Sequence, residues 1–162
     1  MGQINTREVC LFNSTATTSG TGPDINLIQG WQAATVSVNV TTTSGTSPTL
    51  DLFIQKKLGQ AAATDTAGGF LTGTAIYDDL LHFTQITTTP IRIANLCTGP
   101  DTPTANATTI TTADWAQSDA ALGAATIRVG PIGGLWRVKF TIGGTSPSFA
   151  FSVQAQLIPF ST

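Results

Sequence analysis

Apolar and polar residues alternate one by one along much of the chain. Val36, Val38 and Val40 are separated by single polar residues, and the same spacing recurs in 136–142 and 149–153. Alternation with a period of two places the apolar side chains on one face of a β-strand. The pattern predicts nine half-buried strands, at 4–12, 24–28, 33–42, 50–57, 80–87, 91–96, 125–129, 135–142 and 148–158.

The connections between these strands indicate the fold class. No helical segment of 10–15 residues separates successive strands, and such helices are what a parallel βαβ sheet requires. We therefore expect an all-β, antiparallel two-sheet sandwich, jelly-roll-like, with eight or nine strands in one domain over 1–162. Residues 1–12 would form an N-terminal strand or arm. Two segments lose the alternation, 56–79 and 97–124, and are predicted to be long loops.

The sequence contains an internal repeat. SGTSPTLDLFIQ at 44–55 and GGTSPSFAFSVQ at 143–154 align without gaps at an offset of 99 residues. Gly45 and Gly144 can adopt a positive φ, while Pro48 and Pro147 fix φ and interrupt a strand. Each copy is therefore predicted to be a hairpin that joins its two flanking strands.

Charge is scarce. Charged residues make up 10% of the sequence, against 30 Thr and 10 Ser, and the net charge is −2. The few basic residues form no stripe that could follow phosphates, so we expect no nucleic-acid partner. No run of about 20 apolar residues occurs and the N-terminal MGQINTREVCLF lacks a signal-peptide layout, so we expect no membrane partner and synthesis in the cytosol. Because no charge follows Lys139, the last strand should be central or covered by another chain.

Candidate catalytic groups are few. His82 could act as a base beside Asp78 or Asp79, but at a strand position we interpret it as a surface or interface histidine. We place the two aspartates in a turn that leads into a strand. Cys10 and Cys97 are predicted to be free, buried thiols, with a disulfide between them left open. Because no nucleophile, phosphate-loop or metal-ligand motif occurs, we expect no catalytic, cofactor-binding or metal-ligating residue, and hence no enzyme.

Aromatic residues in the irregular segments are the best candidates for interaction. Trp115 lies in the second predicted loop, and Phe70 and Tyr77 lie in the first. Ordered loops of this length are typically functional, so we expect these residues to contact a partner. Trp31 and Trp115 could alternatively serve as aromatic platforms for a glycan, since each stands beside polar residues.

Several strings resemble a known family. TSGTSPTLDLFIQ, YDDLLHFTQI and LWRVKFTIGGTSPSFAFSVQ are similar to segments of the small β-sandwich virion proteins encoded by tailed bacteriophages. The matching positions are 79–86 and 137–149, and the similarity covers about half the chain. It transfers no catalytic residue.

The resemblance implies a capsid decoration, or cement, protein that is made in the host cytoplasm and located in the virion. Such a protein would form a homotrimer and bind the major capsid protein or another virion protein. The alternatives are a tail or neck component, or a sandwich that binds glycans or a receptor. The segment 97–124 is longer than in the family pattern.

Overall fold

The computed structural model describes residues 6–27, 31–66, 70–97, 111–113, 122–128 and 132–160. These residues form nine strands and no helix. The strands are β1 Arg7–Ala16, β2 Gly20–Thr21, β3 Ile25–Asn26, β4 Ala33–Thr66, β5 Phe70–His82, β6 Ile91–Cys97, β7 Thr111–Ala113, β8 Thr126–Arg128 and β9 Leu135–Ile158. None of the described segments is a helix long and apolar enough to cross a membrane.

All nine strands belong to one open sheet. Its main path runs β1-β9-β4-β5-β8-β7, with β2 and β3 paired to β9 and β6 paired to β4. Every pairing is antiparallel except that of β7 with β8. The all-β, antiparallel expectation is confirmed at this level.

The two longest strands pair with each other over most of their length. Register runs from Ala33 opposite Ile158 to Lys56 opposite Trp136. The predicted strands 33–42 and 50–57 are therefore one strand, as are 135–142 and 148–158. The C-terminal half of β9 lies between β1 and β4, so the expectation that this uncharged segment is central is confirmed.

The two GTSP segments form corners, and their prediction as hairpins is wrong. The flanking halves of β4 do not pair with each other, because the first half pairs with β6 and β9 and the second with β5 and β9. Thr46 in the first corner pairs with Thr145 in the second, so the two corners lie against each other. Gly45 (φ 109°) and Gly144 (φ 108°) adopt the predicted positive φ. The motif therefore bends a strand without reversing its pairing.

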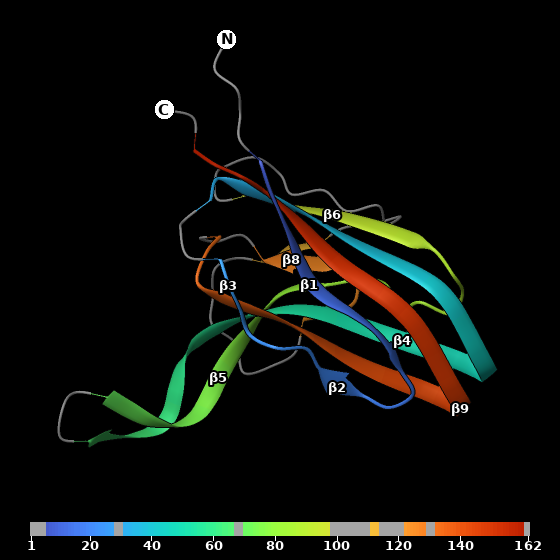
Figure 1. Cartoon of the computed structure of the whole chain (residues 1–162), viewed down its shortest axis with the longest axis horizontal. Helices are drawn as coiled ribbons and strands as arrows, with labels where there is room; N and C mark the ends of the chain where they lie inside the picture. The colour runs from blue at the N-terminus through green and yellow to red at the C-terminus, as the bar shows by residue number, and fades with distance from the viewer. Residues whose placement is uncertain are drawn as a thin grey trace, which may run out of the picture.

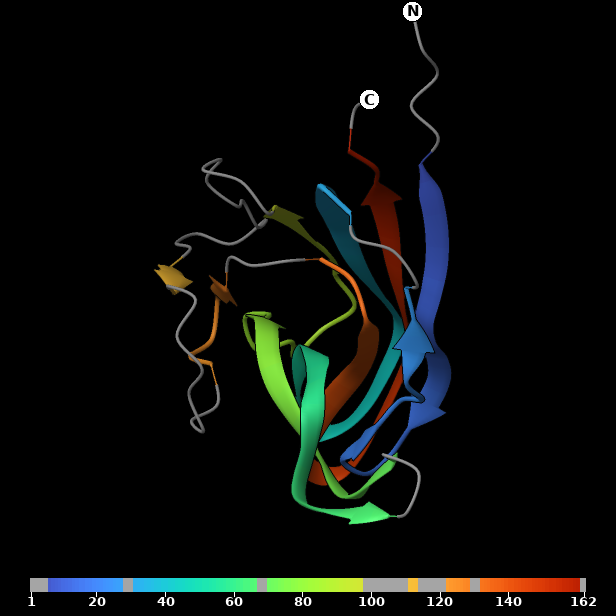
Figure 2. The same ribbon diagram turned by 90° about the vertical axis from the view of Figure 1, so that its left-hand side faces the viewer.

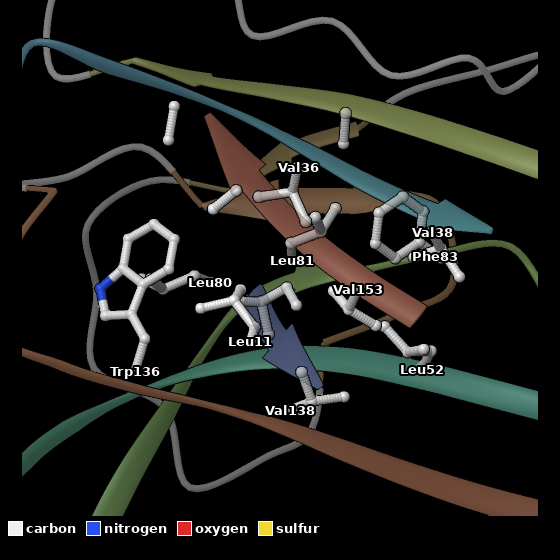
Figure 3. Close-up of a cluster of buried hydrophobic side chains, with 14 of the residues drawn as sticks. Leu11, Val36, Val38, Leu52, Leu80, Leu81, Phe83, Trp136, Val138 and Val153 are labelled. Atoms are coloured by element: carbon white, nitrogen blue, oxygen red, sulfur yellow. The ribbon is translucent and has the colours of Figure 1, made fainter. Parts of the chain in front are cut away.

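The bend folds the sheet over on itself. Figures 1 and 2 show both β4 and β9 turning at the corner, so that their two halves face each other. Alternate side chains from both halves fill the space between them in one apolar cluster, which Figure 3 shows. Val36 and Val153 come from one half of the fold, and Leu52, Trp136 and Val138 come from the other.

The segment 56–79 forms a projecting two-stranded arm, so its prediction as a loop is wrong. β4 continues to Thr66 and β5 starts at Phe70, with residues 66 and 70 paired. Register shifts at three points along this pairing disturb the alternation that the sequence pattern relies on. Of the predicted loop 97–124, the structure describes only 97, 111–113 and 122–124. The other strand predictions hold approximately: β1 ends later than 12, and β5 ends at His82 instead of 87.

Candidate interaction surfaces and the buried polar network

One outer face of the folded sheet carries almost no charge. It is formed by β1, the second half of β9, the first half of β4, and β6, in that order. Register aligns three rows of four residues that face outward, and all are exposed or half-exposed: Glu8-Gln156-Thr35-Asn95, Cys10-Gln154-Ser37-Ile93 and Asn13-Ser152-Asn39-Ile91. We call this surface the outer face. Glu8 is the one charged residue among these twelve.

The edge of the outer face is apolar. Ile91 and Ile93 on β6 are 61% and 40% exposed. Ile91 and Ile93 pair with Asn39 and Ser37 on β4, so the polar surface borders an apolar edge. Apolar side chains grouped on an otherwise polar surface are typical of a contact site.

The root of the arm is held by a clamp of charged and aromatic groups. The Tyr77 hydroxyl donates to the Asp24 carboxylate at 2.9 Å, and Lys57 Nζ lies 3.6 Å from Asp24 Oδ2. The Arg137 guanidinium carbon stands 3.2 Å from the centroid of the Tyr77 ring. Burial, followed by the hydrogen bond to Asp24, raises the pKa of Tyr77. The clamp ties β4, β5 and β9 to the turn before β3.

A buried hydrogen-bonded chain continues inward from this clamp. Arg137 Nε donates to Gln55 Oε1 at 2.9 Å, and Gln55 Nε2 donates to Asp79 Oδ1 at 2.7 Å. The second oxygen of Asp79 accepts from the Leu122 amide at 3.1 Å. Because buried polar groups are costly unless they are paired, each link depends on the next. These hydrogen bonds connect the backbone at Leu122 to β5.

His82 also contacts the backbone of Leu122. Its Nδ1 lies 2.7 Å from the Leu122 carbonyl oxygen, which can only accept, so Nδ1 carries a proton. The ring stacks on Phe53 at 3.8 Å, and Nε2 lies 3.8 Å from Asp51 Oδ1. At 8% exposure His82 is buried, so the surface location expected for it is wrong.

Asp78 and Asp79 lie inside β5, so their predicted place in a turn that leads into a strand is wrong. Both are buried, and the register of β5 against β4 shifts at Leu80, next to them. Arg128 Nη1 lies 3.4 Å from Asp78 Oδ1. Burial raises the pKa of Asp78 even though the Arg128 cation acts in the opposite direction. Asp79 therefore belongs to the hydrogen-bonded network, whereas Asp78 pairs with Arg128.

The two aromatic candidates whose side chains the structure describes, Trp31 and Tyr77, have different surroundings. Trp31 is 8% exposed within the core and donates to the Leu27 carbonyl oxygen at 3.2 Å, so it presents no exposed platform. Tyr77 is half-buried in the arm clamp. Phe70 begins β5 at the far end of the arm, and its side chain lies outside the described part of the chain. Trp115 also lies outside the described residues.

Cys10 is a free thiol on the outer face. It is exposed instead of buried, because it faces outward beside Gln154, and it forms no disulfide with Cys97. The free-thiol prediction is confirmed for Cys10, and its expected burial is wrong.

The most connected polar residues were missed by the sequence reasoning. Gln55 links Arg137 to Asp79, yet a glutamine at the end of an alternating strand carries no distinctive signal. Leu122 contributes only backbone groups, which no side-chain pattern reveals. The outward positions of Ile91 and Ile93 could not have been found from the alternation, because isoleucines that alternate with Arg92 are expected to face the core.

Comparisons with protein-family models, with curated proteins and with solved structures find no match to this chain.

Proposed function

We propose that this protein is a non-enzymatic structural component of a bacteriophage virion that decorates and stabilises the capsid as an oligomer. In this proposal the folded sheet is a jelly-roll-like two-sheet sandwich, and its outer face docks on the assembled shell. The virion origin rests on the motif resemblance described above. The docking role rests on the outer face itself.

The single observation that carries the docking role is the composition of this face. Three neighbouring strands present Thr, Ser, Asn and Gln side chains outward, with the rows in register. The short Thr, Ser and Asn side chains have few rotatable bonds to order on contact, and all four residue types can form hydrogen bonds with many partners. A broad face with one carboxylate also adds little charge repulsion when many copies crowd on a shell.

A glycan- or receptor-binding sandwich is the second candidate, and the described residues favour it less. Sugar sites use exposed aromatic rings beside polar groups. The twelve residues of the outer face include no aromatic residue, and Trp31 is buried. A tail or neck component would use the same face against a different virion protein, so the location within the particle decides between these two.

The test uses particles of the encoding phage that lack this protein. Added protein should sediment with the particles, and Ser37→Lys and Gln154→Lys should each lose binding, because each places a cation in the middle of the face. Thr84→Lys, at an exposed position outside the face, is the matched control and should bind like the wild type. Wild-type binding by both face variants, or no binding by the wild type, would contradict the proposal.

A further inference from the structure

We propose that His82 is an acid-strengthened latch for the segment 122–128. In acid, its imidazolium ring bridges the Asp51 carboxylate on β4 and the backbone of Leu122. At higher pH the ring keeps only the Leu122 contact, so the segment is held less firmly. His82 lies on β5, outside the outer face, so the latch is independent of the proposed docking.

The segment 122–128 relies on side chains for its attachment to the sheet. In the described part of the chain, β8 pairs with β5 only at Leu81 and His82. Among the same residues, the backbone hydrogen bonds outside the strands do not involve 122–125. Leu122 is held instead by Asp79 at its amide and by His82 at its carbonyl oxygen. The turn that follows contains Ala125 at φ 57°, a strained conformation for a residue with a Cβ, so these contacts hold a strained segment in place.

The His82 ring has one satisfied and one unsatisfied nitrogen. Nδ1 donates to the Leu122 carbonyl oxygen, whereas Nε2 is buried without a hydrogen-bond partner among the described residues. Asp51 Oδ1 lies 3.8 Å from Nε2. In the neutral ring Nε2 is an acceptor that faces a second acceptor, the carboxylate. Protonation makes Nε2 a donor to Asp51, and a charged ring also donates more strongly from Nδ1, so acid tightens both contacts.

The surroundings of the ring favour this bridge. The Phe53 and His82 rings stack with their centroids 3.8 Å apart, and the face of an aromatic ring attracts a cation. Gln85 Nε2 donates to Asp51 Oδ2 at 3.2 Å, which keeps the carboxylate near the histidine. The Asp51 side chain is 29% exposed, so it has room to move closer to Nε2. Burial opposes the charged ring, so the bridge depends on Asp51.

The other charged residues in this part of the fold are paired elsewhere or lie further away. They are Lys56 and Lys57 on β4, Asp78 and Asp79 on β5, Arg128 on β8, and Arg137 and Lys139 on β9. Asp78 pairs with Arg128, Lys57 pairs with Asp24, and Gln55 binds both Asp79 and Arg137. Lys56 lies beyond Phe53 along β4, toward the arm, and Lys139 lies on β9, with β4 between it and His82. Asp51 is therefore the charged group that acts most directly on Nε2.

The first measurement is a nitrogen NMR titration of the imidazole ring, which is unambiguous because the sequence has one histidine. In the neutral form the proton should lie on Nδ1. Nε2 should take up its proton at lower pH in Asp51→Asn than in the wild type, because the variant removes the carboxylate charge. Asp24→Asn, in the arm clamp, is the matched control and should titrate like the wild type. A neutral ring protonated on Nε2, or identical titrations of Asp51→Asn and wild type, would overturn the inference.

The second measurement is thermal unfolding at roughly pH 5.5 and pH 8, on either side of the range in which histidine titrates. The wild type should melt about 2–4 °C above Asp51→Asn at the lower pH, and the difference should vanish at the higher pH. Burial raises the pKa of Asp78, but this residue is common to all the variants, so its titration cancels. In a His82→Gln background, which keeps a donor for Leu122, Asp51→Asn should have the same effect at both pH values. A wild-type advantage that does not change with pH would contradict the latch.

Hydrogen exchange at the Leu122 amide tests whether the segment itself is held. This amide donates to Asp79 beside the His82 contact, so it exchanges when the segment lifts from β5. Its protection relative to an unfolded chain should be several-fold greater in wild type than in Asp51→Asn at the lower pH, and equal in the two at the higher pH. Equal protection at both pH values would show that His82 titrates without latching the segment, and would overturn the inference.

Discussion

Gly45 and Gly144 occupy reciprocal positions at the crossing of the two corners. A Cβ on Gly45 would lie 2.7 Å from the carbonyl oxygen of Ser146, and a Cβ on Gly144 would lie 2.7 Å from that of Ser47. The two glycines are 99 residues apart, as are the two serines, which both have φ 49°. The internal repeat thus produces a local two-fold relationship, with Thr46 opposite Thr145 at its centre.

This relationship predicts equal sensitivity at the two corners. Gly45→Ala and Gly144→Ala should each reduce the free energy of unfolding by about 1–2 kcal/mol or more, because φ is positive and backbone atoms block the added methyl group. Gly59→Ala is the matched control, since no atom lies within 4 Å of its Cβ position. Urea denaturation measures all three. Unequal costs at the two corners, or a comparable cost at Gly59, would contradict the reciprocal packing.

The aromatic contacts near the corner predict a large core effect. Phe151 stacks on Phe12 at 4.8 Å and meets Phe140 edge-on at 5.4 Å. Phe151→Ala should reduce the free energy of unfolding by about 3–5 kcal/mol by leaving a cavity. Phe160→Ala, at a residue that is 57% exposed, should change it by less than about 0.5 kcal/mol. Similar losses for both variants in thermal or urea unfolding would argue against this core.

The buried polar chain predicts a difference between two glutamines. Gln55→Leu leaves the Arg137 and Asp79 groups without the bonds that Gln55 provides, so it should cost about 1–3 kcal/mol or more. Gln85→Leu removes only an exposed contact with Asp51, and should cost less than about 0.5 kcal/mol. Equilibrium unfolding in urea compares the two. If Gln55→Leu were as stable as the wild type, the network would have no structural role.

The single tyrosine makes the arm clamp directly observable. Burial and the Asp24 carboxylate raise the pKa of Tyr77, so its phenol should ionise at higher pH in the folded protein than in urea. Asp24→Asn should lower this pKa, because it removes the negative charge beside the hydroxyl. Absorbance of the phenolate follows the titration, and Asp51→Asn, remote from the clamp, should leave it unchanged. A titration insensitive to Asp24→Asn would mean that the clamp does not persist in solution.

The strands with strict alternation could be predicted from the sequence, but their partners could not. Val36 to Val40 and Trp136 to Ile142 repeat every second residue, which is sufficient to assign a strand and its buried face. The GTSP corners show the limit, since glycine and proline indicate a change of direction without showing which strands pair across it. Pairing there is set by the long-range register between β4 and β9.

The candidate site was predictable only in part. The shortage of charge correctly placed the last strand in the centre of the sheet. The arm was missed because register shifts near Gly59 and Ala61 break the alternation on which strand prediction depends. His82 was misplaced because the groups that cover it, the Phe53 ring and the backbone at Leu122, are 29 and 40 residues distant in the chain.

Heating of intact particles tests whether this protein stabilises the capsid. A protein that binds only the assembled shell stabilises that shell by RT ln(1 + [L]/Kd), about 4 kcal/mol per site at a thousandfold excess over Kd. The measurement is the temperature at which DNA is released from complete particles, from particles lacking the protein, and from the latter after adding it back. We expect release at a lower temperature without the protein, and recovery with wild type and Thr84→Lys but not with Gln154→Lys. Release at the same temperature from complete and deficient particles would contradict it.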